Sequence, residues 1–380
     1  MTEIDPDRGP SDRETPRTAI GAGRFLGIVP KLALAAAGLV VALAVAEVVF
    51  RVAGLGPSRH RPSTEEVILP VGAEPVRAPF GYIPHSMVRS TYGSDPRKYF
   101  GPGARVDHSH NSRGWRDREH ELEKPAGTLR ILGLGDSYLW GQGVRIEDTL
   151  LVRLERRLNL EIDDHPVETI NSAEFGSNTV HQLASFEGAG IHYEPDLVLL
   201  VFVPNDINLP ARRATTERID FFRAYTSIYL DPDAVRSPSK FLGWAWQVVL
   251  RDIRARRHIH RLVDGFKPGG PGARECRLAL GGIADLCRSH DIPLVVAIFP
   301  FLHGLDGRNP FRSIHEVVAG YCVELDVTCV DLAGAFPGYS GPELWVHPTD
   351  QHPNEEAHAL AAEALIGPVR AALEGRRNPT

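Results

Sequence analysis

The sequence has few cysteines and no excess of positive charge. Its 380 residues include only four cysteines, which are too few for a disulfide scaffold. Lys and Arg total 42 against 48 Asp and Glu, which gives a net charge of -6. Proteins that bind duplex nucleic acid usually carry a basic excess, so we expect no nucleic-acid partner. The chain also lacks the composition of a disordered protein, since 43% of its residues are hydrophobic and 24% are charged.

The hydrophobic residues are unevenly distributed, with one long apolar run near the N-terminus. Leu32–Phe50 spans 19 residues and contains a single charge, Glu47. A helix needs about 20 apolar residues to cross a bilayer, so we expect a single-pass signal anchor over residues 32–54. A signal peptide cleaved after Ala46 and a buried helix of a soluble domain stay open as alternatives. Basic residues slightly favour a cytoplasmic tail at residues 1–31 and an extracytoplasmic C-terminal domain.

The remaining chain predicts a connector followed by one α/β domain. Residues 55–128 are rich in Pro, Gly, Arg and His without a sustained hydrophobic period, so we interpret them as a juxtamembrane connector. Over residues 129–372, near-continuous apolar strands alternate with helices, which favours a parallel sheet covered on both faces. Residues 207–272 interrupt this alternation, and we interpret them as an inserted lid or cap. Strands are predicted at 129–135, 167–170, 196–203, 292–299 and 327–332, and helices at 148–160, 179–189, 274–290, 311–324 and 354–373.

Polar residues follow the predicted strands at the positions where such sheets place their sites. Ser137 follows the first strand, Gly176 the second and Asn205 the third, while Asp350 and His352 precede the last helix. Open parallel sheets bind ligands at the carboxyl ends of their strands. We therefore expect these five residues, distant in the sequence, to converge.

These residue types suit acyl transfer through a serine nucleophile. A serine hydroxyl needs a base, and His352 can act as one because imidazole titrates near neutral pH. Asp350 can hold the imidazole tautomer from the same loop. The backbone N–H groups of Ser137 and Gly176 and the side-chain amide of Asn205 can donate to an oxyanion, each contributing about 3 kcal/mol. The predicted catalytic residues are thus Ser137, His352 and Asp350.

At these segments the sequence resembles the SGNH/GDSL hydrolases. The resemblance covers residues 129–372 and consists of Gly135-Asp136-Ser137-Tyr138, Gly176, Pro204-Asn205-Asp206 and Asp350-Gln351-His352-Pro353, in that order. It implies a flavodoxin-like, three-layer α/β/α fold with a mainly parallel sheet, without a cofactor or a metal ion. Many members place the aspartate three residues before the histidine, where this sequence has Thr349; the spacing of Asp350 is seen in some alginate-acetylating relatives. Two alternatives stay open: His347 as the base, and Asp350 as a plain loop residue.

The N-terminal anchor and residues 111–116 look like the membrane-anchored bacterial branch of this family. That branch is associated with esterases and with O-acyltransferases of exported glycans. The resemblance implies hydrolysis of acyl esters, with acetyl as the expected group, on an exported glycan or a lipid-linked substrate. The alternatives are an O-acyltransferase, for which a membrane acyltransferase is a candidate partner, and a catalytically silent glycan-binding scaffold.

Overall fold

Two units make up the chain, and each is described by itself. The computed structural model describes residues 28–56, 63–74, 76–206, 238–267, 269–307 and 309–377. Contacts divide the chain into residues 1–57 with 236–246, and residues 58–235 with 247–380.

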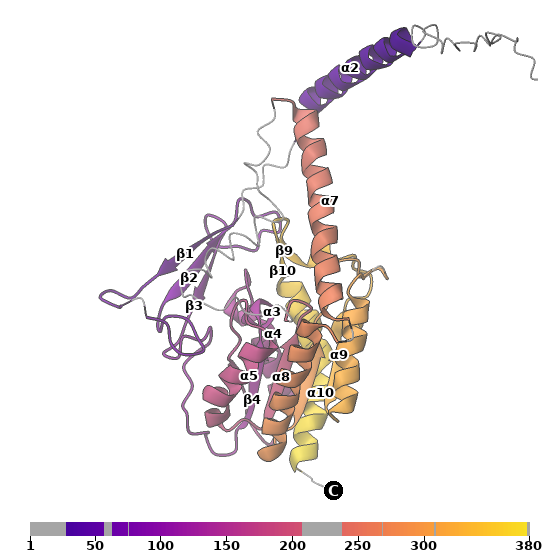
Figure 1. Ribbon diagram of the computed structural model, residues 1–380. Helices are drawn as coiled ribbons and strands as arrows, with labels where there is room; N and C mark the ends of the chain where they lie inside the picture. The colour runs from indigo at the N-terminus through magenta and orange to yellow at the C-terminus, as the bar shows by residue number, and fades with distance from the viewer. Residues whose placement is uncertain are drawn as a thin grey trace, which may run out of the picture. The chain divides into compact units, whose positions relative to one another are not determined.

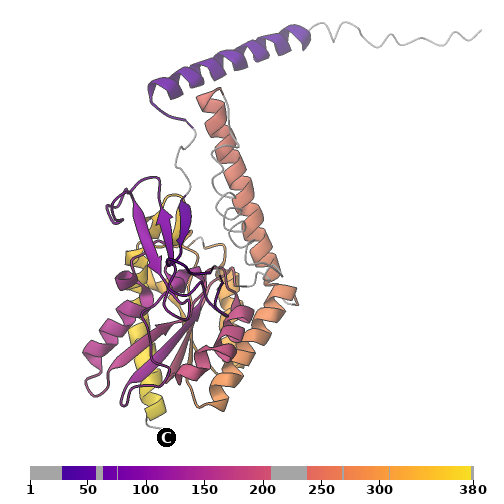
Figure 2. The ribbon, with the colours of Figure 1, turned by 90° about the vertical axis from the view of Figure 1, so that its left-hand side faces the viewer.

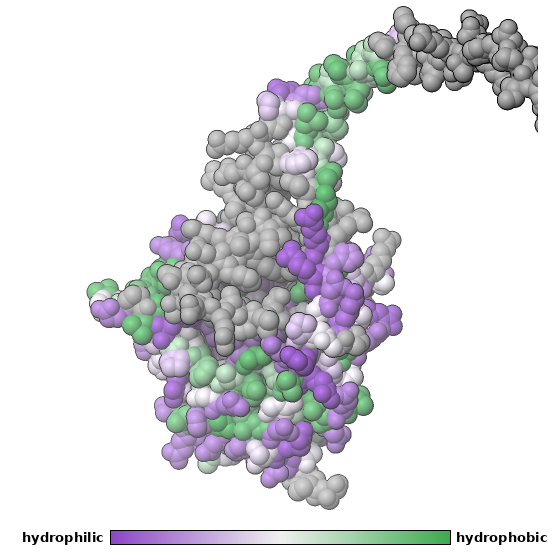
Figure 3. Space-filling model, in the orientation of Figure 1, coloured by the Kyte–Doolittle hydropathy of each residue, from purple (hydrophilic) through white to green (hydrophobic). Residues whose placement is uncertain are grey.

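The smaller unit is built on one long apolar helix. This helix, α2 (Ile28–Val52), contains Leu, Ala and Val at most positions, and its residues Pro30–Val52 have a mean hydropathy of 2.5. Its apolar side chains are exposed, as the hydrophobic surface in Figure 3 shows. Among the described residues, α2 is the one helix that is both long enough and apolar enough for a membrane anchor or a signal sequence.

The larger unit contains a five-stranded parallel sheet with the strand order β5-β4-β6-β7-β8 (Figure 1). Its strands are β4 (Leu129–Gly135), β5 (Val167–Asn171), β6 (Leu197–Phe202), β7 (Leu294–Ile298) and β8 (Thr328–Asp331). Every residue of β6 and β7 is buried because both faces of the sheet are covered by helices, which explains their unbroken apolar sequences. The predicted parallel sheet is therefore confirmed.

Helices form a layer on each face of this sheet (Figure 2). The chain crosses the sheet in one direction from β4 to β5 and in the opposite direction from β5 to β6. Because both crossovers are right-handed, α4 and α5 lie on opposite faces. The helix α4 packs against α10, and α5 packs against α8. The bounds are α4 (Leu150–Glu161), α5 (Thr179–Gly188), α8 (Pro271–Ser289), α9 (Arg312–Glu324) and α10 (Glu355–Arg377). This is the three-layer α/β/α arrangement that the sequence predicted.

The connector contains a small antiparallel sheet that the sequence did not predict. Its strands are β1 (Thr64–Ile68), β2 (Met87–Thr91) and β3 (Arg105–Ser109), in the order β1-β2-β3. The buried positions of β2 and β3 hold Val88, Ser90, Val106 and His108. Because half of these are polar, the hydrophobic alternation that would indicate strands is incomplete.

The predicted insertion contains one long helix. Residues 207–237 of the insertion lie outside the described residues, and α7 (Lys240–Gly265) follows them. The interpretation of residues 207–272 as a lid or cap stays a prediction.

Short elements complete the larger unit. The four-residue helix α3 (Ser137–Trp140) follows β4, and β9 (Trp345–His347) pairs with β10 (Asp350–Pro353) as an antiparallel hairpin. Short 3-10 helices lie at Ile146–Asp148, Gly190–Tyr193, Leu332–Ala335 and Pro342–Leu344.

Candidate active site

A tight turn from strand to helix presents Ser137. The strand β4 ends at Gly135, α3 begins at Ser137, and Asp136 between them accepts a hydrogen bond from the backbone N–H of Tyr138 (2.9 Å). A Cβ at Gly135 would lie 2.7 Å from the Cβ of Leu139, so this turn requires glycine. The turn therefore holds Ser137 at the carboxyl end of a central strand, where the sequence predicted it.

His352 and Asp350 form a hydrogen-bonded chain with Ser137. His352 Nε2 lies 2.9 Å from Ser137 Oγ, and His352 Nδ1 lies 2.5 Å from Asp350 Oδ1. Both residues belong to β10, so the β9–β10 hairpin carries them to the turn after β4. The side chains of Ser137 and Asp350 are largely shielded from solvent. The three predicted catalytic residues are thus brought together.

Asp350 determines how His352 is protonated. Burial alone would lower the pKa of His352, but the adjacent Asp350 carboxylate outweighs burial and raises the pKa above its usual value. Burial alone would raise the pKa of Asp350, whereas the charge and hydrogen bonds of His352 and the hydroxyl of Tyr92 lower it. Asp350 is therefore ionised at neutral pH and accepts a hydrogen bond from the N–H at Nδ1 of His352. Nε2 is left as the acceptor that faces the Ser137 hydroxyl.

Asn205 and Gly176 come from the ends of the two neighbouring strands. Asn205 Nδ2 donates to Asp136 Oδ2 over 2.9 Å, which joins the end of β6 to the serine turn. Gly176 has a φ of 69°, and no described atom lies within 4 Å of the position that its Cβ would occupy. Next to it, the ring of Phe175 lies 5.5 Å from that of His352. Both segments thus flank the triad, and within the described part of the chain the space in front of Gly176 is open.

The structure separates the two candidate histidines. His347 Nε2 lies 2.9 Å from Ser94 Oγ, and its Nδ1 lies 2.7 Å from Thr349 Oγ1. His352, by contrast, contacts the Ser137 hydroxyl. Thr349 therefore bonds to His347 and not to the base of the triad. The geometry favours His352 as the partner of Ser137.

Two residues of the connector reach the triad, which the sequence did not predict. Tyr92 directly follows β2, and its hydroxyl donates to Asp350 Oδ2 over 2.8 Å. Glu65 of β1 accepts a hydrogen bond from Gln142 Nε2 (3.0 Å). Burial of the carboxyl group and the charge of Asp350 raise the pKa of Glu65 to about 7, and its ionised form adds to the rise in the pKa of His352. The Tyr92–Asp350 contact joins residues 258 positions apart. Only the packing of the small sheet determines this contact, so no local pattern in the sequence indicates it.

Arg116 holds the far end of the serine helix. Its guanidinium is buried and donates to the backbone oxygens of Trp140 (2.7 Å), Gly141 and Val144. It also lies 5.0 Å from the Trp140 ring centre. These donors satisfy carbonyl groups that the end of a helix leaves without intrahelical partners. Arg116 therefore fixes the end of α3, whose first residue is Ser137.

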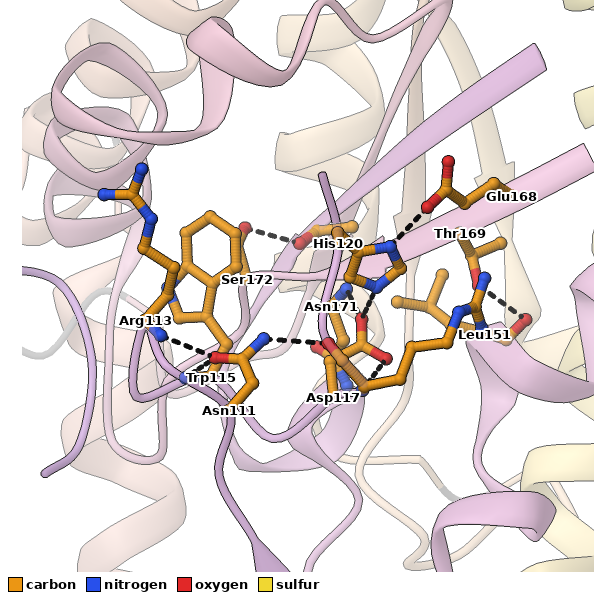
Figure 4. A network of polar contacts seen from close by, with 12 residues as sticks. Asn111, Arg113, Trp115, Asp117, His120, Leu151, Glu168, Thr169, Asn171 and Ser172 are labelled. Carbon is orange, nitrogen blue, oxygen red and sulfur yellow. Dashed lines mark hydrogen bonds and ion pairs between the residues drawn. The ribbon is translucent and has the colours of Figure 1, made fainter. Parts of the chain in front are cut away.

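A polar network joins the connector to the edge of the large sheet (Figure 4). His120 Nε2 lies 3.0 Å from Asp117 Oδ2, and His120 Nδ1 contacts Glu168 of β5. The backbone N–H of Asn171 donates to Asp117 Oδ2 over 2.7 Å. Burial alone would lower the pKa of His120, but the two carboxylates raise it to about 9. The network fixes the segment that carries Arg116.

The chain matches the model of the GDSL-like lipase/acylhydrolase family over residues 134–360, more than half of its length. No curated protein matches it significantly.

Solved structures with a similar course of the chain include three ester hydrolases. A lipase/acylhydrolase from Enterococcus faecalis is 13% identical, with 64% of this chain and 96% of that chain covered and a TM-score of 0.39. The psychrotrophic esterase EstA from a Pseudoalteromonas species is 15% identical, with 64% and 98% covered and a TM-score of 0.38. The acetyl xylan esterase AlAXEase is 14% identical, with 63% and 100% covered and a TM-score of 0.41.

The family match spans the serine turn, the Gly176 loop, the Asn205 strand end and the β9–β10 hairpin. The chain therefore belongs to the GDSL-like lipase/acylhydrolase family, an assignment that implies an enzyme hydrolysing ester bonds.

Proposed function

We propose that this enzyme cleaves acyl esters through a covalent intermediate on Ser137. The observation that carries the proposal is the continuous hydrogen-bonded chain from Asp350 through His352 to Ser137 Oγ. A buried carboxylate, an imidazole whose unprotonated Nε2 faces the serine and a hydroxyl at the end of a strand are the parts that this chemistry needs.

In the first half-reaction, Ser137 Oγ attacks the ester carbonyl carbon while its proton passes to His352 Nε2. The carbonyl oxygen becomes an oxyanion, which the N–H groups of Ser137 and Gly176 and the amide of Asn205 stabilise. The intermediate then collapses, the bond to the alcohol breaks, and His352 returns the proton to the departing alcohol oxygen.

In the second half-reaction, water attacks the acyl-enzyme. His352 takes one proton from the water, the second tetrahedral intermediate collapses, and the proton returns to Ser137 Oγ as the acid leaves. Asp350 keeps its charge throughout and stabilises the imidazolium that forms in both halves.

We propose acetyl as the acyl group and an exported glycan or lipid-linked molecule as its carrier. Phe175 supports this proposal, since its partly exposed ring lies 5.5 Å from that of His352 and can offer an apolar face to a small acyl group or a sugar ring. The apolar helix α2 supports an enzyme held at a membrane with its catalytic domain exported.

An O-acyltransferase is the second candidate. In that reaction a sugar hydroxyl replaces water as the attacking group, and the same residues act in the same roles. The spacing of Asp350 and His352, seen in some alginate-acetylating relatives, favours this candidate. A silent scaffold that only binds glycans is the third alternative, and the complete hydrogen-bonded chain argues against it.

Labelling with a fluorophosphonate tests the nucleophile. The detergent-solubilised full chain should react at Ser137, as mapped by peptide mass spectrometry, and should hydrolyse p-nitrophenyl acetate. Ser137→Ala and His352→Gln should both abolish turnover, whereas His347→Gln, the matched histidine variant, should retain it. Turnover that survives in Ser137→Ala would exclude the mechanism.

A second assay separates hydrolase from transferase. The acyl-enzyme is formed from labelled acetyl donor and offered an acetyl-free oligosaccharide in water. Label released mainly as acetate supports the hydrolase, and label transferred to the oligosaccharide supports the transferase. A wild-type protein that neither labels nor turns over supports the scaffold.

A further inference from the structure

The acidic residue of the apolar helix binds the start of α7. Glu47 Oε2 accepts hydrogen bonds from Ser239 Oγ (2.7 Å) and the backbone N–H of Phe241 (2.9 Å). Glu47 Oε1 accepts from the backbone N–H of Lys240 (3.0 Å) and from Arg51 Nε (2.6 Å). The first N–H groups of a helix have no intrahelical partner, and a carboxylate satisfies two of them here.

Aromatic packing strengthens the same junction. The Phe50 ring lies 5.2 Å from the ring of Phe241 and 5.2 Å from that of Trp244, with the first pair edge to face. The contact is apolar and lies beside the polar one on Glu47. The end of α2 and the first turns of α7 therefore form one small structural unit, as their contacts indicate.

The first turns of α7 expose large apolar side chains. Leu242 is 49% exposed, Trp244 40% and Trp246 55%. Farther along α7, Val249 lies three residues after Trp246 and Ile253 four residues after Val249, and both are also exposed. Exposed apolar clusters of this kind mark interaction surfaces. Tryptophan is enriched where a bilayer meets water, because its ring is apolar and its N–H is polar.

We propose that Leu242, Trp244 and Trp246 contact the boundary between headgroups and acyl chains of the bilayer that α2 crosses. This lipid-contact surface starts beside the last turn of α2, where a spanning helix leaves the apolar layer. Lys240 and Arg51 lie at the same junction and match the negative phosphates of lipid headgroups. The insertion thus supplies a second membrane contact, a role that is independent of the ester chemistry but rests on α2 spanning the bilayer.

Quenching by brominated lipids tests this surface. The full chain is reconstituted into phosphatidylcholine vesicles whose acyl chains carry bromine either near the headgroup or near the chain terminus. Of the five tryptophans, Trp115 and Trp140 are buried, and Trp345 lies in β9. We expect stronger quenching by the bromine near the headgroup, and loss of most of that quenching in W244F/W246F but not in W345F.

Several outcomes would overturn the proposal. One is equal quenching in W244F/W246F and wild type. Another is stronger quenching by the bromine near the chain terminus than by the bromine near the headgroup. A third is quenching of the tryptophans by aqueous acrylamide but not by bromolipid. Tryptophans protected from both reagents would indicate a protein partner and also contradict it. The single variants W244F and W246F repeat the test if the double variant unfolds. Ser137→Ala should leave the quenching unchanged, so failure of this proposal is distinguishable from failure of the proposed function.

A second variant tests the junction itself. Glu47→Ala removes the acceptor for the first N–H groups of α7, so amide hydrogen exchange at Lys240 and Phe241 should accelerate at least tenfold in the vesicles. Glu66→Ala, a matched change at an exposed position of β1, should leave that exchange unchanged. Unchanged exchange in Glu47→Ala would contradict the role assigned to this carboxylate.

Discussion

Tyr92 is the residue whose contribution to the site is least evident from its position in the chain. Its hydroxyl donates to the oxygen of Asp350 that does not face His352, and its ring stacks on Phe100 with a centroid distance of 4.4 Å. The hydroxyl therefore orients the carboxylate, while the ring is held by packing. Tyr92 is a positioning residue, because it acts on the reaction only through Asp350.

Tyr92→Phe should keep the stacked ring and lose one hydrogen bond to a charged group, worth about 1.5–3 kcal/mol. We expect kcat to fall about tenfold with little change in KM. The acid limb of the pH profile should move to higher pH, because a carboxylate with one donor fewer acts more strongly on His352. Tyr99→Phe, which removes a hydroxyl bonded to Asp148 instead, is the control. A rise in KM alone would contradict a positioning role.

The pH dependence of activity follows from Asp350. His352 acts as a base only when neutral, so activity should fall as pH drops through its raised pKa. In Asp350→Asn the negative charge is absent, so the pKa of His352 falls and the acid limb moves to lower pH, while kcat drops by roughly 10³–10⁴-fold. Asp331→Asn changes a second Asp–His pair, 2.9 Å from His315, and should leave the profile unchanged. An acid limb that stays in place in Asp350→Asn would exclude this assignment.

At the scale of elements, the short helix α3 depends on a buried cation. Four residues cannot stabilise a helix by themselves, since helix nucleation is costly. The side chain of Asp136 satisfies its first turn and the guanidinium of Arg116 its last carbonyls. The position of Ser137 therefore depends on a residue of the connector.

Arg116→Met should destabilise the fold by about 2–4 kcal/mol, because it leaves buried carbonyl groups without donors. We expect a lower urea midpoint and, in the folded protein, a reduced kcat. Arg113→Met changes an exposed neighbouring arginine and should shift stability by less than about 1 kcal/mol. An unchanged midpoint in Arg116→Met would show that water replaces the guanidinium without cost.

At the scale of the whole molecule, the connector and the sheet are joined by a charged histidine. The side chain of His120 is 1% exposed and lies between Asp117 and Glu168. Its pKa rises from 6.5 to about 9 on folding. A group whose pKa is raised on folding stabilises the folded state. This contribution is complete at a pH below the unfolded pKa and is lost as the pH rises through the folded pKa. The window of this effect is therefore pH 6.5 to about 9.

His120→Gln should cost about 3 kcal/mol of unfolding free energy at about pH 6, and the difference from wild type should narrow by about pH 10. Urea unfolding of both proteins in detergent at the two pH values measures it. His290→Gln, at an exposed site, should show no such dependence. A difference that grows with pH would reverse the sign and refute the charged state of His120.

Several parts of the site could be predicted because each depends on local sequence. Gly135 before Ser137 indicates a sharp turn after an apolar strand, and the order of the polar residues matches the order of the strand ends. Tyr92 and Glu65 could not be predicted in this way, since β1 is exposed at four of its five positions and β2 and β3 bury polar as well as apolar residues. The choice between His347 and His352 also required the structure, because both precede a proline on one hairpin.

The order of residues along the chain was enough to predict the parallel sheet, the apolar helix and the strand ends at which Ser137 and Asn205 lie. These features follow from short-range patterns: apolar runs bury strands, and helical periods cover them. Which side chains meet, in contrast, depends on the packed fold. It joined Asp350 to Tyr92, the end of α3 to Arg116, and Glu47 to the start of α7. Such contacts depend on how whole elements pack. The sequence next to each of these residues contains no pattern that would predict its partner.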